Sequence, residues 1–388
     1  MKRLCLTILL MLGLLASCSR EANGSFTTPC DSKPTVQTTT RSDSTAHELP
    51  QPIVTTEQLV TTDPVVNPKP VTTPMVTTPP PVTEPIPVFG NVDLSDVNRN
   101  DRTVIYTKQQ TPLCDEDGKE LKQINAGKAL ILLKQSEDYA VILYQDTLYL
   151  TYPNLLTTEV PEEARALQEE LGGIYYPGGE ILVAIDAGHQ GKAMKDKEPL
   201  GPGSDEMKTM VSSGTQGVST QIAERELNLQ VSILLRDELI SRGYSVLMIR
   251  ESHDVTISNV QRAQVANAYH ADAFIRVHAN GSTRQSDRGS ITICQTPENP
   301  YNGDLFAESR RLSDCVLADY CKATGIKKRG VWETDTMTGI NWAEVPVTIV
   351  EMGYMTNPEE DELMATDDFR RSAAIGMANG LDAFFAAE

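Results

Sequence analysis

The chain has 388 residues, of which 40% are hydrophobic, and this size allows one or two globular domains beside an irregular segment. Its formal net charge of −19 argues against nucleic acid as a partner and against passive adhesion to an anionic surface. A polyanionic partner would therefore have to be held by a shaped site.

Residues 1–17 predict a secretory signal peptide. A basic start, MKR, precedes the apolar run LCLTILLMLGLL, which is too short to span a bilayer as a stable anchor. The run ends in LASC, which resembles the lipobox of bacterial lipoproteins. This resemblance implies that Cys18 is lipidated, so that the protein is extracytoplasmic and anchored to a bacterial membrane. The alternative is an ordinary signal peptide with an incidental cysteine.

Residues 18–90 predict a disordered linker. Prolines mix there with Thr and Val in units such as VTTPMVTTPPPVTEP, a composition that favours an extended, solvated backbone and cannot bury a core. The expected role of this segment is to hold the folded part away from the membrane. The cysteines of the chain show no metal-type spacing, and no disulfide is predicted among them.

Residues 93–156 predict a small, barrel-like, all-β domain. An Asp-Gly turn separates two short runs in TVIYTKQQTPLCDEDGKEL, and ALILLKQSEDYAVILYQDTLYLTY alternates apolar stretches with turn residues. The length and strand rhythm resemble bacterial Src-homology-3-type barrels, which often help secreted hydrolases to bind the cell wall. A β-rich spacer without a ligand is the equal alternative.

Residues 179–388 follow a short acidic helix and alternate strands with helices. Apolar strands are expected at 181–186, 245–249, 273–278, 290–294 and 347–352, with helices over 224–243, 259–271, 304–325 and 369–385. This pattern predicts an α/β domain with a mainly parallel twisted sheet covered by helices on both faces. Ligands of such sheets bind at the carboxyl ends of the strands.

Two histidines end strands of this predicted sheet, His189 in IDAGHQG and His278 in AFIRVHANG. A single histidine there is more often a packed residue, but a matched pair favours a metal site. A catalytic zinc site uses three protein ligands, commonly two histidines and a carboxylate. Glu224 opens the next helix and is the carboxylate candidate, although Glu226 competes with it and acidic residues are common in a first helical turn.

Glu351 ends the apolar run of VPVTIVEMGYMTNPEED. Because burying a bare carboxylate is costly, Glu351 must be solvated, paired or close to a cation. Near a metal-activated water it would be suited to act as a general base, and the alternative is a surface carboxylate at a strand end. Arg276 lies on the same side of its strand as His278. We expect Arg276 either to touch a substrate carboxylate or carbonyl, or to pair with a buried acid.

Five motifs in this order resemble the zinc-dependent N-acetylmuramoyl-L-alanine amidases of bacterial cell walls, over residues 179–387. They are DAGH at 186–189, ERELNL at 224–229, RESHD…R…AN at 250–267, VHAN at 277–280 and VEMGYMTNPEE at 350–360. The resemblance implies a phosphorylase/hydrolase-like fold, Zn²⁺ bound by His189, Glu224 and His278, and Glu351 as the catalytic residue. Asn280 is expected to join Arg276 in contacting the substrate.

One departure from the family lies between His189 and Glu224. Many members have a short glycine-rich loop there, whereas this chain has 34 residues (224 − 189 − 1), so the shape of the cleft wall stays open. The resemblance implies hydrolysis of the amide bond between N-acetylmuramic acid and the L-alanine of the peptidoglycan stem peptide. The alternatives are a zinc peptidase acting on stem peptides or secreted proteins, and a non-catalytic lipoprotein that binds the cell wall. The sequence identifies no activator protein.

Overall fold

The computed structural model describes residues 89, 92 and 94–386, all within one compact unit of residues 81–388. The predicted signal peptide, the lipidation site Cys18 and the predicted linker, apart from residue 89, lie outside the described residues. Among the helices of the described part, none is both long and apolar enough to cross a membrane. The cysteines described, at positions 114, 294, 315 and 321, are free thiols.

The first seven strands form one antiparallel sheet in the order β3-β2-β6-β5-β4-β1-β7. Gln145 and Asp146 join β5 to β6 with φ values of 48° and 57°, which are those of a two-residue type I′ turn. The Asp-Gly turn of the sequence connects β2 to β3, where Asp115 accepts hydrogen bonds from two backbone N–H groups of the turn. The strands are β1 (Thr103–Thr107), β2 (Thr111–Cys114), β3 (Glu120–Ile124), β4 (Ala129–Gln135), β5 (Ala140–Tyr144), β6 (Thr147–Thr151) and β7 (Leu156–Thr157), with a 3₁₀ turn over Pro153–Leu155.

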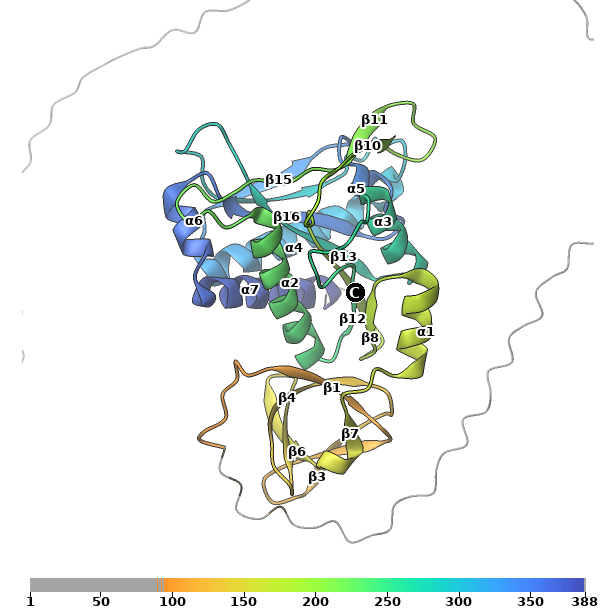
Figure 1. The fold of residues 1–388 in the computed structure, drawn as a ribbon, viewed down its shortest axis with the longest axis vertical. Helices are drawn as coiled ribbons and strands as arrows, with labels where there is room; N and C mark the ends of the chain where they lie inside the picture. The colour runs from red at the N-terminus through yellow and green to blue at the C-terminus, as the bar shows by residue number, and fades with distance from the viewer. Residues whose placement is uncertain (1–88, 90–91, 93, 387–388) are drawn as a thin grey trace, which may run out of the picture. The chain divides into compact units, whose positions relative to one another are not determined.

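A second sheet has the order β15-β14-β16-β13-β9-β12-β8 (Figure 1). It is mixed, because β12, β9, β13 and β16 run parallel in succession, while β8 and β14 are antiparallel to their neighbours β12 and β16. Strands β8 and β15 were not expected from the sequence. The strands are β8 (Ile174–Tyr176), β9 (Leu182–Ala187), β12 (Ser245–Met248), β13 (Ala273–Asn280), β14 (Ser290–Cys294), β15 (Lys328–Glu333) and β16 (Val347–Tyr354).

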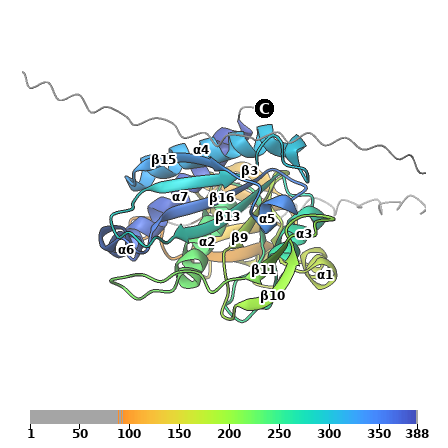
Figure 2. The same cartoon turned by 90° about the horizontal axis from the view of Figure 1, so that it is seen from above.

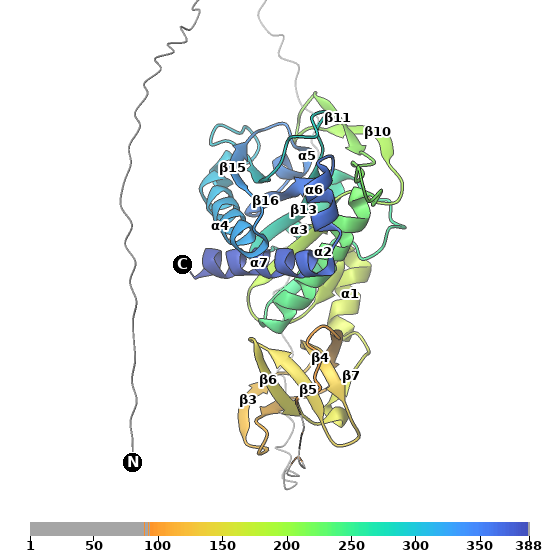
Figure 3. The ribbon, with the colours of Figure 1, turned by 90° about the vertical axis from the view of Figure 1, so that its left-hand side faces the viewer.

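Helices cover both faces of this second sheet, which is why its central strands are buried along most of their length (Figure 1). On one face α2, α4 and α7 share a hydrophobic cluster with β13 and β16, and α4 and α7 lie side by side (Figure 3). On the other face α3 and α5 pack in a second cluster. The helices are α1 (Glu162–Leu171), α2 (Glu224–Ser241), α3 (Asn259–Ala268), α4 (Phe306–Thr324), α5 (Thr338–Asn341), α6 (Pro358–Met364) and α7 (Asp367–Phe385), with a 3₁₀ turn over Gly303–Leu305.

The long segment between His189 and Glu224 forms a β-hairpin of β10 (Met194–Pro199) and β11 (Met207–Val211). The hairpin lies beside α3 (Figure 2). Asn259, at the start of α3, donates to the backbone oxygen of Met210 at 2.6 Å, and Trp342 donates to that of Pro199 at 3.0 Å. The segment between His189 and Glu224, whose shape the sequence did not predict, is therefore ordered and hydrogen-bonded to α3 and to Trp342 after α5.

Candidate metal centre

Three neighbouring strands, β9, β13 and β16, end at the same edge of the sheet because they are parallel. In this register Val277 lies opposite Ala187 and His278 lies opposite Glu351. The histidine that follows β9 and the residues near the ends of β13 and β16 are thus placed at one edge. This is the edge at which open α/β sheets bind ligands.

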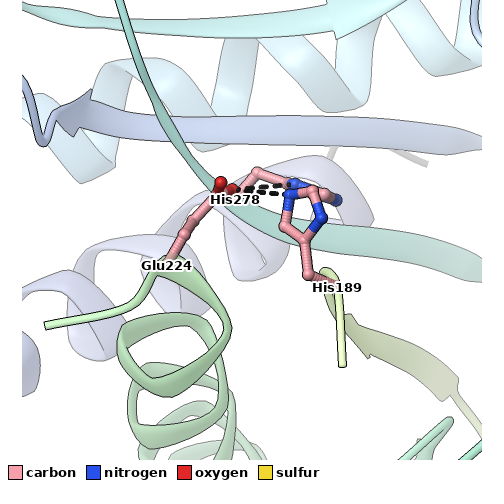
Figure 4. Close-up of side chains that lie close together, drawn as sticks. All are labelled: His189, Glu224 and His278. Atoms are coloured by element: carbon pink, nitrogen blue, oxygen red, sulfur yellow. Dashed lines mark hydrogen bonds and ion pairs between the residues drawn. The ribbon is translucent and has the colours of Figure 1, made fainter. Parts of the chain in front are cut away.

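His189, Glu224 and His278 point toward one another from three different elements (Figure 4). Their ligand atoms all lie within 4.8 Å of one another. Glu224 Oε1 is 3.0 Å from His189 Nε2 and 3.2 Å from His278 Nδ1. The competing candidate of the sequence, Glu226, lies outside this group.

His189 occupies the left-handed region with φ 59°, which is uncommon for a residue other than glycine. Its position is held from two sides. The ring atom Nδ1 lies 3.0 Å from the backbone oxygen of Ser212, to which it can donate, and Arg262 Nη2 donates to the backbone oxygen of His189 at 3.1 Å. When a metal is bound, Nδ1 as the donor would leave the lone pair of Nε2 available to the ion, which is the tautomer that a metal ligand needs.

Two buried arginines stabilise the turn that leads from β9 to His189. Arg250 donates to the backbone oxygens of Ala187 and Gly188 at 2.7 and 3.0 Å, and Arg262 donates to Asp186 at 2.5 Å. Burial alone would raise the pKa of Asp186, but the charges of Arg262 and Arg276 outweigh it and hold that pKa well below its usual range. Asp186 is therefore a buried negative charge close to His189, Glu224 and His278, the three ligand candidates that are called the metal group below.

Glu224 is buried, and its carboxylate is held by backbone as well as by histidines. Oε2 accepts from the N–H of Thr215 at 2.8 Å, and Oε1 accepts from the N–H of Ala279 at 3.1 Å. Burial would raise the pKa of Glu224, but hydrogen bonds from His189 and His278 outweigh burial and lower it. Glu224 is therefore an anionic ligand candidate with a fixed orientation.

The loop before Glu224 is fixed by Asp361 of α6. Its Oδ2 accepts from the N–H groups of Ser219 and Thr220 at 2.7 and 2.8 Å, and its Oδ1 accepts from the hydroxyl of Thr220 at 2.7 Å. Asp361 is 2% exposed. Asp361 thus fixes the loop that leads into helix α2.

Two glycines leave room for the histidine rings. A Cβ at Gly188 would lie 2.2 Å from Cε1 of His278, and a Cβ at Gly214 would lie 2.7 Å from Oε2 of Glu224. Both approaches are under 3.0 Å, which real Cβ atoms essentially never show, so that the neighbouring side chain would have to shift. The glycine of the DAGH motif is therefore required by packing against the second histidine.

The pKa values of His278 and Glu351 are both shifted in the direction that zinc chemistry needs. Burial lowers the pKa of His278 to about 4, so that its imidazole is neutral at pH 7 and able to bind a metal. Burial, together with the negative charge of Glu224, raises the pKa of Glu351 to about 8. Its Oε2 is buried and has no hydrogen-bond partner among the described residues.

A cavity of about 510 Å³ opens beside the metal group. Glu351, Arg276 and Asn280 all line it, together with the three ligand candidates. Arg276 also forms the buried pair that the sequence offered as an alternative, since its Nε donates to Asp186 at 2.9 Å. Asn280 lies at the end of β13, where its side chain accepts from the N–H of Gly281 at 2.8 Å.

The donor set fits a zinc ion. Two imidazoles and one carboxylate are the ligands of many catalytic zinc sites, which keep the fourth position open. Ligand atoms about 2 Å from a tetrahedral ion lie roughly 3.3 Å from one another, and the separations of 3.0 and 3.2 Å found here are close to this value. The unpartnered oxygen of Glu351 provides a further polar group in the same cavity.

Some supporting residues were not predicted from the sequence. Asp361, Asn228 and Arg250 act on backbone atoms or on a ligand, and Asn228 Nδ2 lies 3.3 Å from both Glu224 Oε1 and the backbone oxygen of Gly188. The only signal for Asn228 in the sequence was its position one helical turn after Glu224. The structure shows that it is buried. None of the three could be assigned a partner without the fold.

Comparison with known proteins places this domain in context. Residues 183–383 match the family described as N-acetylmuramoyl-L-alanine amidase. An uncharacterised protein of Bacillus subtilis is 26% identical over 204 residues, which cover 52% of this chain and 84% of that protein. An N-acetylmuramoyl-L-alanine amidase of Mycobacterium tuberculosis is 25% identical over 218 residues, covering 54% and 88%. A solved amidase from Mycobacterium smegmatis, 23% identical, aligns with 54% of this chain and 99% of its own at a TM-score of 0.49.

Proposed function

The chain belongs to the N-acetylmuramoyl-L-alanine amidase family, and from this premise we propose that it cleaves its substrate with a zinc ion held by His189, Glu224 and His278. It is a peptidoglycan hydrolase that acts on the amide bond between N-acetylmuramic acid and the L-alanine of the stem peptide. The chemistry that zinc supplies in such a site is polarisation of the amide carbonyl and a lowered pKa of the attacking water.

Glu351 is the residue proposed to move the proton. It accepts a proton from the attacking water and delivers one to the nitrogen of L-alanine as the C–N bond breaks. The observation that carries this role is the position of Glu351 directly across from His278, with one buried oxygen unpartnered in the same cavity as the metal group. A carboxyl with a raised pKa is suited both to accept the proton and to return it.

Digestion of purified peptidoglycan by the zinc-loaded full chain tests the function. We expect new L-alanine amino termini and intact muramic acid. New termini within the stem would indicate a zinc peptidase instead, and no new termini would indicate a non-catalytic wall-binding protein. Metal analysis adds an independent readout, because we expect about one zinc per chain in the wild type and almost none in His278→Ala.

The extracytoplasmic placement is also a proposal. An amidase that is exported, lipidated at Cys18 and carried on the linker of residues 18–90 would have its polymeric substrate within reach. The β-rich segment at 93–156 is proposed as a cell-wall-binding module. Labelling with a radioactive fatty acid tests the anchor, and the Cys18→Ala variant should lose the label. Binding of segment 93–156 to purified cell wall tests the module.

A further inference from the structure

The cavity beside the metal group carries one permanent positive charge. Its lining includes the acids Glu224 and Glu351, and Arg276 is the single lysine or arginine among the described residues that line it. The remaining wall near Arg276 is neutral, consisting of Asn259 and the start of α5 at Met337 to Gly339. A ligand group that reaches this part of the cavity therefore meets a guanidinium.

The donors of Arg276 are only partly used by the protein. Nε donates to Asp186 at 2.9 Å and Nη2 donates to Asn259 Oδ1 at 2.8 Å, whereas Nη1 has no partner among the described residues. Nη1 lies against Gly339, where a Cβ would come within 1.8 Å of it. Glycine at position 339 thus makes room for the guanidinium itself, and both Arg276 and Gly339 line the cavity.

The carboxylate that pairs with Arg276 is shared with a second arginine. Asp186 is the carboxylate partner of Arg276, and it is shared with Arg262, so that two buried guanidiniums oppose one carboxylate. Asn259 adds a dipole but no charge. The pair of N–H groups on Nη1, in a largely buried setting, is complementary to a carboxylate of the ligand.

The spacing of Arg276 and His278 along β13 is similar to the separation between the scissile bond and one carboxylate of the substrate. Arg276 and His278 lie on one side of β13, two residues or roughly 6.6 Å apart along the strand. The second stem residue of peptidoglycan is a glutamate linked through its γ-carboxyl, which leaves its α-carboxyl free or amidated. From the scissile nitrogen to the α-carbon of that residue the chain spans about 5 Å, and its α-carboxyl extends about 1.5 Å further.

We propose that Nη1 of Arg276 binds the free α-carboxylate of the second stem residue, and that this contact selects stems in which that group is not amidated. The proposal rests on the amidase function above and adds to it a residue that determines specificity. Asn259 is a positioning residue in this arrangement, since it fixes Nη2 and is itself fixed by the hairpin through Met210.

The test uses the zinc-loaded full chain and two soluble muramoyl peptides that differ only at the α-carboxyl of the second residue, one a carboxylate and one a carboxamide. We expect kcat/KM to favour the carboxylate by roughly ten- to a hundredfold, as for one charge-assisted hydrogen bond. Equal rates, or a preference for the carboxamide, would overturn the inference while leaving the amidase function intact. Hydrolysis of neither peptide would overturn both.

Variants then assign the preference to Arg276. In Arg276→Met the ratio of the two kcat/KM values should fall to about one, whereas Arg276→Lys should keep part of the preference. A loss of folded protein lowers both rates equally and leaves the ratio unchanged, so the ratio separates recognition from stability. Arg284→Met, at a side chain that is 74% exposed, is the matched control and should keep the wild-type ratio. A full preference in Arg276→Met contradicts the proposal.

The wild-type protein offers a readout that needs no variant. The cleaved stem dipeptide, L-alanyl-γ-glutamate, should inhibit hydrolysis at least tenfold more strongly than the same dipeptide carrying an α-carboxamide. Equal inhibition by the two dipeptides would count against the contact.

Discussion

Glu351, the residue proposed to carry the proton, has one buried oxygen without a hydrogen-bond partner among the described residues and lines the same cavity as the ligand candidates. We expect Glu351→Gln to lower kcat by at least about a thousandfold, since an amide cannot accept the proton. The zinc content should stay near one per chain, because Glu351 lies outside the group of ligand candidates. Amidase assays and metal analysis of the same preparation check both statements, and Glu344→Gln, at an exposed position, is the control.

The pH dependence of stability in the metal-free protein follows from the same residue. The pKa of Glu351 is raised from 4.5 to about 8 by burial and by the charge of Glu224. The folded state thus holds a proton that the unfolded state releases, so this stabilising contribution is present below about pH 4.5 and is lost as pH rises toward about 8. The loss is on the order of a few kcal/mol.

Glu351→Gln should remove this part of the pH dependence. Urea unfolding of the metal-free wild type and of the variant, at about pH 5 and about pH 8.5, measures it. We expect the variant to be the more stable protein at the higher pH by a larger margin than at the lower pH. A margin that does not change with pH would mean that Glu351 is already ionised in the metal-free fold.

At the scale of elements, helix α6 fixes the loop that leads to Glu224, one of the three ligand candidates. Asp361 holds the loop of residues 215–223 through the three hydrogen bonds to Ser219 and Thr220. Asp361→Asn keeps the volume but replaces one acceptor by a donor, so Glu224 loses its fixed position. We expect zinc affinity to fall about ten- to a hundredfold.

Competition with a chromogenic chelator measures this affinity. Glu362→Gln, on the same helix but exposed, should bind zinc like the wild type. Equal affinity in Asp361→Asn and Glu362→Gln would show that the loop holds Glu224 without α6.

The sequence predicted the elements in which apolar residues form a continuous run or recur with the helical period. The central strands β9, β13 and β16 consist of near-continuous apolar runs, and their carboxyl ends predicted the convergence of His189, His278 and Glu351. Strand β15 was missed because its residues, KRGVWE, are largely exposed at a sheet edge, and β10 was missed because MKDKEP has no apolar alternation. Their pairing depends on neighbours that are distant in the sequence.

The same reasoning separates the site residues that were found from those that were not. The types of three residues, His189, Glu224 and His278, indicate metal binding already in the sequence. By contrast, Asp361 and Arg250 contact backbone atoms that only the fold brings close to them. For Arg276 the sequence left two readings, a ligand contact or a buried pair. The buried pair with Asp186 is present, and the ligand contact stays a prediction.

At the scale of the whole molecule, the ligand candidates come from positions 189, 224 and 278, so that an ion bound there joins three separate parts of the chain. Zinc bound at the proposed site would stabilise the folded state, by about 4 kcal/mol when free zinc is a thousandfold above Kd. We expect removal of zinc by a chelator to lower Tm by several degrees, reversed by added zinc. Calorimetry measures this shift, and His278→Ala should show none of it.

The hairpin of β10 and β11 has a consequence for how this enzyme could be altered. Ser212, the residue after β11, contacts the ring of His189 through its backbone oxygen. Met210 of β11 accepts a hydrogen bond from Asn259, which in turn accepts one from Arg276. We therefore expect shortening of this insertion to disturb both proposed traits, the retention of zinc and the selection of the stem. We expect a graft of the hairpin into a relative to transfer stem selection only if Asn259 and Arg276 are transferred with it.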